Sequence, residues 1–214
     1  MKICTLGASV FATNTYLVVD EDTNKAVLID PDGNGKQYAA FLDKEGYSLE
    51  AILLTHGHFD HIGSIDALVE IKKVPVYIHA KDEELLADGA KNASSVFFGG
   101  KGIVCNIKPR IIKDTDTLVF GGLQFVVMET PGHTRGSVCY FAGDAVFTGD
   151  TFFADGYGRT DLYGGSTRDM KMSLKKIGAI EGDYEIYPAH GPHTTLKTEK
   201  YANPYLRKAM GLGI

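Results

Sequence analysis

Seven histidine and aspartate side chains, spread over four short segments, have the types and spacing of metal ligands. The first segment, residues 56–61, has the sequence HGHFDH, which puts four potential ligands within six residues. Positions 56 and 58 would point about 200° apart on a helix, so one helix face does not explain the spacing. A chain that leaves a strand at Thr55 and curls through a loop does explain it, and Gly57 permits a tight backbone there. A surface loop that is histidine-rich by chance is disfavoured, because the whole chain has only seven histidines.

Three later segments place a histidine or an aspartate beside a glycine, just after an apolar run. The run that ends at Glu129 leads to His133, and two further runs lead to Asp150 and His190. Sites in layered α/β proteins gather where strands end, so these side chains are expected to meet. A single histidine in such a place is more often structural, but the combination favours a metal site. The candidate ligands are His56, His58, Asp60, His61, His133, Asp150 and His190.

These ligands are all imidazoles and carboxylates, with no thiolate, which predicts the chemistry of the site. Such a set suits two divalent metal ions, with zinc favoured and iron or manganese as alternatives. Two ions roughly 3.5–4 Å apart share a hydroxide, because metal binding lowers the pKa of water to about 7. The site then needs no serine or cysteine nucleophile. A thioester is a suitable substrate, because a thiol with a pKa of about 8.5 leaves without a general acid.

Alternating strands and helices must position these segments, and their order predicts an α/β fold with sheets packed together and helices outside. Residues 88–106 are ambiguous, because they combine many Gly, Ser and Asn residues with Val96, Phe97 and Phe98. The two phenylalanines suggest either a flap over the metals or a small packing cluster. The expected strands are Lys2–Leu6, Thr13–Asp20, Lys25–Asp30, Ala51–Thr55, Val76–His79, Leu118–Phe120, Leu123–Glu129, Val138–Phe141, Ala145–Thr148 and Tyr184–Tyr187. The expected helices are Gly35–Gly46, Ile62–Lys72, Asp82–Ala87, Thr167–Ile180 and the C-terminal stretch.

The bulk properties indicate an ordinary globular protein, expected to be one domain over residues 1–214. Hydrophobic residues make up 44% and charged residues 23% of the chain, which disfavours disorder and coiled coil. The net charge of −5 gives no support to a nucleic-acid or anionic-membrane partner, so we expect a small-molecule substrate. Three unpaired cysteines and the lack of a signal-like or membrane-spanning run predict a cytoplasmic protein. The oligomeric state is not predicted.

The motif segments resemble the signature of the metallo-β-lactamase superfamily, from about Asp30 to His190. Within that superfamily, the chain looks like glyoxalase II (hydroxyacylglutathione hydrolase) and its shorter relatives. The stretches that carry the resemblance are THGHFDHIG at residues 55–63, TPGHT at 130–134, TGDTFF at 148–153 and NPYLR at 203–207. The resemblance implies a four-layer αββα sandwich of two mixed sheets with helices outside, and a metal-dependent thioester hydrolase.

The resemblance also implies a role for each candidate ligand. Asp60 would orient the attacking hydroxide as well as bind metal. Asp30 matches an aspartate that supports the ligands from behind, although a plain turn residue before Pro31 is an equal alternative. His56, His58 and His133 would hold one ion, Asp60, His61 and His190 the other, and Asp150 would bridge them.

Two departures from glyoxalase II put the glutathione part of the substrate in question. Glyoxalase II usually has a histidine at the position of Gly57, and it carries a larger helical region after the last ligand. Arg159 matches a substrate-holding stretch and could bind a carboxylate, although a surface arginine in a Gly-rich loop is equally consistent. The alternative function is a persulfide dioxygenase of the same fold, a class that uses one iron held by two histidines and an aspartate.

Overall fold

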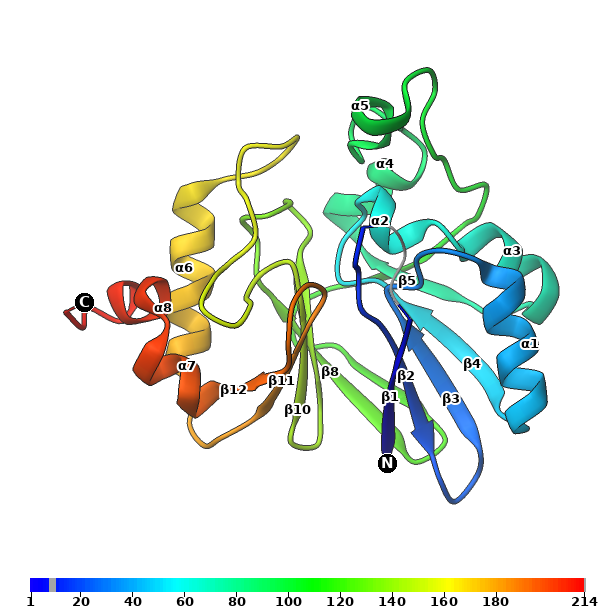
Figure 1. The fold of residues 1–214 in the computed structure, drawn as a ribbon, viewed down its shortest axis with the longest axis horizontal. Coiled ribbons are helices and arrows are strands. Elements are labelled where there is room, and N and C mark those ends of the chain that lie inside the picture. Colours follow the sequence, from blue (N-terminus) through cyan, green and yellow to red (C-terminus); the bar gives the residue numbers. More distant parts are fainter. Residues whose placement is uncertain (8–10, 214) are drawn as a thin grey trace.

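Two six-stranded β-sheets face one another, and helices cover their outer faces (Figure 1). This computed structural model describes residues 1–7 and 11–213. The first sheet has the order β1-β2-β3-β4-β5-β6, with strands Lys2–Leu6, Thr15–Asp20, Lys25–Ile29, Ser48–Leu53, Val76–His79 and Arg110–Ile112. The second has the order β12-β11-β10-β9-β8-β7, with β7 to β12 spanning Thr117–Phe120, Leu123–Glu129, Val138–Ala142, Ala145–Gly149, Glu185–Pro188 and Thr194–Thr195.

Both sheets are mixed, as predicted. In the first sheet, β1, β2 and β3 pair antiparallel, whereas β3 to β6 pair parallel. In the second, β10 and β11 pair parallel, whereas the other neighbouring strands pair antiparallel. The predicted four-layer αββα sandwich is therefore confirmed. The helices are α1 Gly35–Glu45, α2 Phe59–Ile62, α3 Ile65–Lys72, α4 Glu83–Leu86, α5 Ser94–Phe98, α6 Thr167–Gly178, α7 Leu196–Ala202 and α8 Pro204–Ala209, with a short 3₁₀ turn η1 at Ala80–Asp82.

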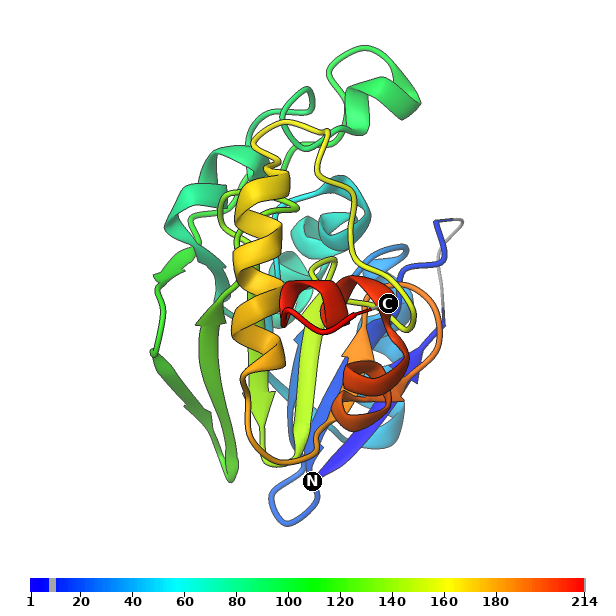
Figure 2. The same cartoon turned by 90° about the vertical axis from the view of Figure 1, so that its left-hand side faces the viewer.

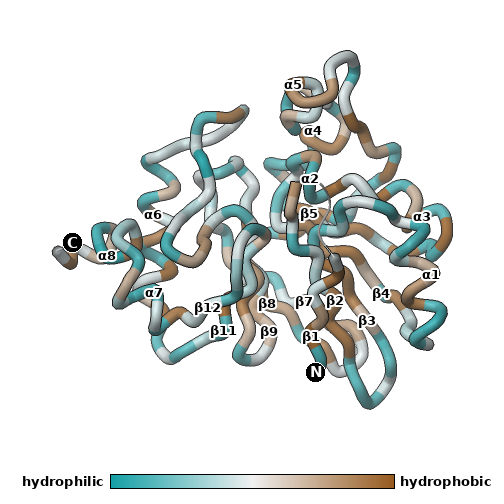
Figure 3. Tube along the Cα trace, viewed as in Figure 1, coloured by the Kyte–Doolittle hydropathy of each residue, from teal (hydrophilic) through white to brown (hydrophobic). Residues whose placement is uncertain are grey.

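Strand β2 shows how the sequence pattern produces the layers, because successive side chains point to opposite faces of a sheet. Tyr16 and Val18 pack between the two sheets, against residues such as Phe125 of the second sheet. Leu17 and Val19 pack on the outer face, beneath α1 and α3. All six residues of β2 are buried, and the central four are apolar on both faces of the sheet rather than alternating. Figure 3 shows the apolar strands inside and the polar turns at the ends of the sandwich.

The outer face of the second sheet is covered by α6 and α8 (Figure 2). The side chain of Ser166 caps α6 by accepting a hydrogen bond from the backbone N–H of Asp169. Met170, Leu174 and Ile177 follow at helical spacing and bury against the sheet. None of the helices among residues 1–7 and 11–213 is long and apolar enough to cross a membrane.

The structure differs from the sequence-based expectation in three places. The short strands β6 and β12 were not predicted, and each is held by a single neighbouring strand. The helix predicted from Ile62 is divided into α2 and α3, so the second half of the HGHFDH segment lies on a helical turn. The ambiguous residues 88–106 contain the one-turn helix α5.

The strand ends bring the candidate ligands to one edge of the sandwich. His56 follows β4 in the first sheet, whereas His133, Asp150 and His190 follow β8, β10 and β11 in the second. Gly132 lets the segment after β8 lie directly against α6, where there is no room for a side chain. Its φ of +147° also favours glycine at this position. A Cβ atom at Gly132 would lie 2.5 Å from the Met170 backbone nitrogen and Cα.

We expect Gly132→Ala to lower the free energy of unfolding by at least about 1–3 kcal/mol, because it adds both backbone strain and a clash with α6. Thermal unfolding followed by circular dichroism measures the change. Gly99→Ala is the matched control, since Gly99 also has a positive φ, +69°, but nothing lies within 4 Å of its added Cβ. Equal losses in the two variants would show that the contact with α6 is not the cause.

Candidate metal centre

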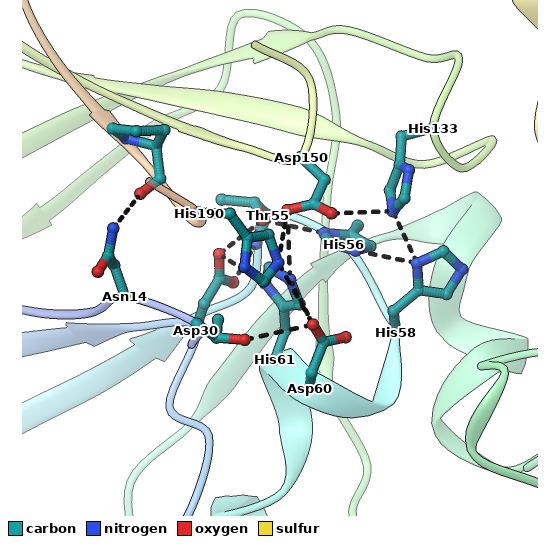
Figure 4. A network of polar contacts seen from close by, with 12 residues as sticks. Asn14, Asp30, Thr55, His56, His58, Asp60, His61, His133, Asp150 and His190 are labelled. Atoms are coloured by element: carbon teal, nitrogen blue, oxygen red, sulfur yellow. Dashed lines mark hydrogen bonds and ion pairs between the residues drawn. The ribbon is translucent and has the colours of Figure 1, made fainter. Parts of the chain in front are cut away.

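Three imidazoles from both sheets form the first group of candidate ligands (Figure 4). Nε2 of His56 lies 3.2 Å from Nδ1 of His58, which lies 2.8 Å from Nε2 of His133. One nitrogen of each ring falls within 4.8 Å of the others, so the three can hold a single ion. His56 and His58 come from the loop after β4, and His133 comes from the loop after β8.

The second group consists of Asp60, His61 and His190, whose ligand atoms also lie within 4.8 Å of one another. Oδ2 of Asp60 lies 3.9 Å from Nε2 of His61 and 3.4 Å from Nε2 of His190. The hydroxyl of Thr13 donates a hydrogen bond of 3.2 Å to the same carboxylate oxygen. Asp60 and His61 lie on α2, so this short helix faces the loop that follows β11.

Asp150 lies between the two groups, and its two oxygens face different ones. Oδ2 lies 3.4 Å from Nε2 of His133 in the first group. Oδ1 lies 3.5 Å from Nε2 of His61 and 3.4 Å from Nε2 of His190 in the second. A carboxylate in this position is able to contact two ions at once.

Backbone and side-chain acceptors set which nitrogen of each ring carries its proton. Nδ1 of His133 lies 2.7 Å from the main-chain carbonyl of Arg159, so Nδ1 donates and the lone pair of Nε2 faces the centre. Nδ1 of His56 lies 3.2 Å from the hydroxyl of Thr55, which itself donates to Asp30. The same reasoning therefore leaves Nε2 of His56 as a lone pair directed into the first group.

Asp30 supports both groups from behind. Its carboxylate accepts hydrogen bonds from the backbone N–H of Thr55 at 2.8 Å and from the Thr55 hydroxyl at 2.6 Å. Its Oδ2 also lies 3.0 Å from Nδ1 of His61. Asp30 holds a φ of +50°, which is uncommon for a residue other than glycine, so its conformation is set by these contacts. The structure gives Asp30 a ligand-facing place rather than that of a plain turn residue.

The centre is buried, and its electrostatics favour positive charge. Burial and the neighbouring His133 lower the pKa of His58 to about 3, so this imidazole is uncharged. Burial opposes ionisation of Asp150, but His133 and His61 hold the pKa of its carboxyl far below the usual value. Burial likewise opposes charge on His61, yet Asp30 and Asp60 raise its pKa well above the usual value. Neutral imidazoles and ionised carboxylates are the forms that bind metal, so an ion bound by His61 would have to displace the proton that the neighbouring carboxylates favour on this ring.

Two orphaned polar atoms test whether this set of residues fits a metal ion. Nε2 of His61 and Oδ1 of Asp150 are buried and have no hydrogen-bond partner. Buried polar atoms of native proteins are rarely left in this state, and these two face each other across the centre. A cation in this place would satisfy both, so the residues fit the ion.

Asp82 joins the two loops of the first group, and the sequence analysis assigned it no role. Its fully buried carboxylate accepts hydrogen bonds from the backbone N–H groups of Gly57 at 3.1 Å and Gly136 at 2.7 Å. The hydroxyl of Thr134 donates a third at 2.7 Å. Gly57 separates His56 from His58, and Thr134 follows His133, so Asp82 sets the distance between these segments. In the sequence Asp82 resembles only a helix-start residue, so no signal distinguished it.

Gly57 is required for a different reason from the one predicted. Its φ is not positive, so the tight curl does not depend on glycine's backbone freedom. A Cβ atom there would lie 2.7 Å from Cβ of Leu85 and 3.1 Å from the carbonyl oxygen of Asp82. A residue with a side chain at position 57 would therefore require α4 and the residues before it to shift.

A cavity of about 190 Å³ opens onto both groups. Arg159 lines it, but its guanidinium makes two hydrogen bonds, of 2.7 and 2.8 Å, to the carboxylate of Asp161. A substrate carboxylate would have to compete with Asp161 for this side chain. The residues lining the cavity are Phe11, His58, Phe59, Asp60, Ala93, Phe97, His133, Asp150, Arg159, Leu162 and His190.

Two other histidines lie outside the centre. Nε2 of His79 pairs with Glu129 at 2.8 Å, which gives this buried ring a structural role. The ring of His193 packs against Tyr16 and Tyr187, with ring centroids 5.6 and 4.6 Å away. Neither belongs to a group of metal-binding geometry among the described residues.

Comparison with known proteins extends these observations. The chain is 36% identical over 198 residues to the probable metallo-hydrolase YqgX of Bacillus subtilis, covering 90% of this chain and 92% of that protein. The crystal structure of the B3 metallo-β-lactamase BLEG-1 matches with a TM-score of 0.90 and 35% identity, over 96% of this chain and 99% of that one.

Two further solved structures are similar over nearly the whole chain. TTHA1623 in a di-iron-bound form has a TM-score of 0.84 and 34% identity, covering 94% of this chain and 99% of that one. ETHE1 from Myxococcus xanthus has a TM-score of 0.78 and 30% identity, covering 95% of this chain and 84% of that one. A family model described as the metallo-β-lactamase superfamily matches residues 8–190, and the chain belongs to that superfamily.

Proposed function

We propose that this chain is a glyoxalase II-like hydrolase that uses two divalent metal ions to cleave a small thioester. Asp150, whose two carboxylate oxygens face the two ligand groups, carries the dinuclear part of the proposal. In this assignment Asp150 would contact both ions. His56, His58 and His133 would hold one ion, and Asp60, His61 and His190 would hold the other.

The ligand chemistry supports two ions rather than one. Seven ligands exceed the four that a single tetrahedral zinc uses. Five imidazoles and two carboxylates suit zinc, our first choice, and also iron or manganese. The similarity to TTHA1623, whose structure is described as di-iron-bound, supports a dinuclear centre and makes iron a serious alternative.

Bound divalent ions supply a water nucleophile that is ionised near neutral pH and a positive site for the carbonyl oxygen. Asp60 lines the cavity, so it can accept a hydrogen bond from the attacking water and orient it toward the carbonyl carbon. Water adds to that carbon, the carbon–sulfur bond breaks, and the sulfur leaves with the electron pair. The products are a carboxylic acid and a thiol, which takes up the second proton of the water.

The residues lining the cavity favour a thioester over an ester or amide. Apart from the metal-ligand candidates and Arg159, the described lining residues are apolar and supply no proton donor. An alkoxide or amide nitrogen needs a proton to leave, whereas a thiol with a pKa of about 8.5 leaves as the thiolate. This lack of an acid is the observation that carries the choice of substrate class.

The C-terminal helices support weak recognition of glutathione. Leu206 of α8 packs against α6 on the outer face of the second sheet. No residue of α7 or α8 is among the described residues that line the cavity. Among the described residues that line the cavity, Arg159 is the one arginine or lysine, and it is paired with Asp161. A deep glutathione grip is therefore not expected.

A mono-iron persulfide dioxygenase of the same fold is the second candidate. The observation that favours it is a further group, His56, His61 and Asp150, whose ligand atoms lie within 4.8 Å of one another. Two histidines and an aspartate are the ligand types that this enzyme class uses. Metal content and oxygen uptake separate the two functions.

We expect about two metal ions per chain in the wild-type protein and loss of most metal and nearly all activity in Asp150→Ala. Removal of the carboxylate leaves two cations without their shared ligand. Elemental analysis and thioester turnover measure the effect. Asp43→Ala is the control, because Asp43 is an exposed carboxylate on α1 that pairs with Lys72. Full metal content and turnover in Asp150→Ala would contradict the bridging assignment.

Asp82→Asn is expected to weaken metal binding by the first group by about tenfold or more, the range seen when partners behind a ligand are lost. The amide keeps the size of the side chain, but its NH₂ group cannot accept from Gly57, Gly136 or Thr134. Competition with a chelator measures the affinity. Asp88→Asn is the control, since Asp88 caps the neighbouring turn by accepting from the Ala90 and Lys91 N–H groups. Unchanged affinity in Asp82→Asn would show that the loops hold their spacing without this carboxylate.

The substrate prediction compares lactoylglutathione with a lactoyl thioester of a simpler thiol. We expect similar kcat/KM values, because few contacts are left to recognise the glutathione part. A preference of several orders of magnitude for the glutathione form would argue against weak recognition. No thioester hydrolysis, but oxygen uptake with a persulfide and about one iron per chain, would favour the dioxygenase.

A further inference from the structure

Four phenylalanine rings, Phe11, Phe59, Phe97 and Phe98, pack together beside the metal centre. The Phe11 ring lies 4.8 Å from Phe59 and 5.8 Å from both Phe97 and Phe98, measured between centroids. The Phe59 ring lies 5.0 Å from Phe97 and 5.6 Å from Phe98. We call these four rings the aromatic wall. Phe11, Phe59 and Phe97 line the same cavity as His58 and Asp60.

The wall remains open to solvent on one side. Phe59 is buried, but Phe97 and Phe98 on α5 are each 55% exposed. Figure 3 shows this apolar turn at the tip of the molecule, beyond α4. A contiguous apolar surface that adjoins a polar site is typical of a ligand pocket rather than of an ordinary surface. The alternative of a closed packing cluster does not explain the exposure of α5.

The loop that carries α5 is fastened to the helix that carries the ligands. The backbone N–H of Phe59 donates to the carbonyl of Asn92 at 3.1 Å. The fully buried amide of Asn92 donates to the carbonyls of Leu85 at 2.9 Å and Ile103 at 2.8 Å. Ser94, at the start of α5, bonds to the Asn92 side chain at 2.6 Å. The position of the wall relative to Asp60, the neighbour of Phe59, is therefore set before a ligand arrives.

The size of the cavity decides which half of a thioester meets the wall. The cavity volume of about 190 Å³ is below the roughly 300–1,000 Å³ of pockets that enclose drug-sized ligands. The carrier thiols of cellular thioesters are larger and polar, so they must extend out of this space. A short acyl group fits inside, one bond away from the carbonyl carbon that is attacked.

We propose that the aromatic wall is an acyl-binding subsite, and that the preferred substrates are thioesters of short, apolar acyl groups. This inference rests on the proposed thioesterase function. Each methylene of the acyl chain exchanges water for contact with Phe11, Phe59 or Phe97 while the carbonyl stays at the metal centre. The selectivity of the enzyme then resides in the acyl half of the substrate.

The first test uses acetyl, propanoyl and butanoyl thioesters of one small thiol. Each kcat/KM is divided by the rate of hydrolysis in free hydroxide, which removes differences in intrinsic reactivity. We expect the corrected value to rise up to about fourfold per methylene in the wild type, the factor that corresponds to ~0.8 kcal/mol. In Phe97→Ser this increase per methylene should fall to less than half of the wild-type value. Tyr201→Ser, which removes an 82% exposed ring on α7, should keep the wild-type trend.

The second test does not need turnover. Calorimetry measures the binding of acetate, propanoate and butanoate to the metal-loaded protein, with the same two variants. Affinity that rises along the series in the wild type and Tyr201→Ser, but not in Phe97→Ser, supports the subsite. A flat series in the wild type, or an unchanged trend in Phe97→Ser, overturns it. If all three thioesters are hydrolysed but the corrected kcat/KM does not rise along the series, the acyl-binding subsite is wrong and the proposed thioesterase function stands. Absence of any thioester hydrolysis sinks the proposed function, and the carboxylate series then decides the subsite.

Discussion

The orientation of the His61 ring depends on the buried carboxylate of Asp30. This carboxylate faces Nδ1 of His61 and accepts two hydrogen bonds from Thr55. Through Thr55 it also determines which nitrogen of His56 carries the proton. Asp30 is in turn fixed by the first sheet, because its N–H donates to the carbonyl of Leu53 at 3.1 Å and its own carbonyl accepts from Thr15 at 2.9 Å. The pairing of β3 with β4 is thus transmitted directly to the ligand groups.

The ligand types could be predicted from the sequence, because histidines and aspartates gathered at strand ends have few structural explanations. The groups behind them could not. Asp82 contacts segments 25 and 54 positions away, and such contacts leave no local pattern. Arg159 was identified by its side chain, yet its carbonyl contacts His133, and every residue has a carbonyl. The aromatic wall was left open in the sequence because a pair of phenylalanines amid glycines is compatible with either packing or exposure.

The strands and helices could be predicted from the sequence where strands are apolar and helices have capping residues. Strands β5 and β8 have the bounds that were predicted. The strands that were missed, β6 and β12, have three and two residues, so neither is long enough to show a period. The break between α2 and α3 was also invisible in the hydrophobic pattern, because Ile62 and Ile65 both pack into the same outer core. The separate first turn, α2, places Asp60 and His61 at the centre.

Each ligand group draws on both sheets: the segment after β4 supplies His56 and Asp60, and the second sheet supplies His133 and His190. An ion bound by either group is therefore a cross-link between the halves of the sandwich, and its binding free energy adds to the cohesion of the two sheets. Neither half holds a complete group by itself. During synthesis, the second group remains incomplete until His190 has left the ribosome, whereas all three residues of the first group have been added once His133 is in the chain.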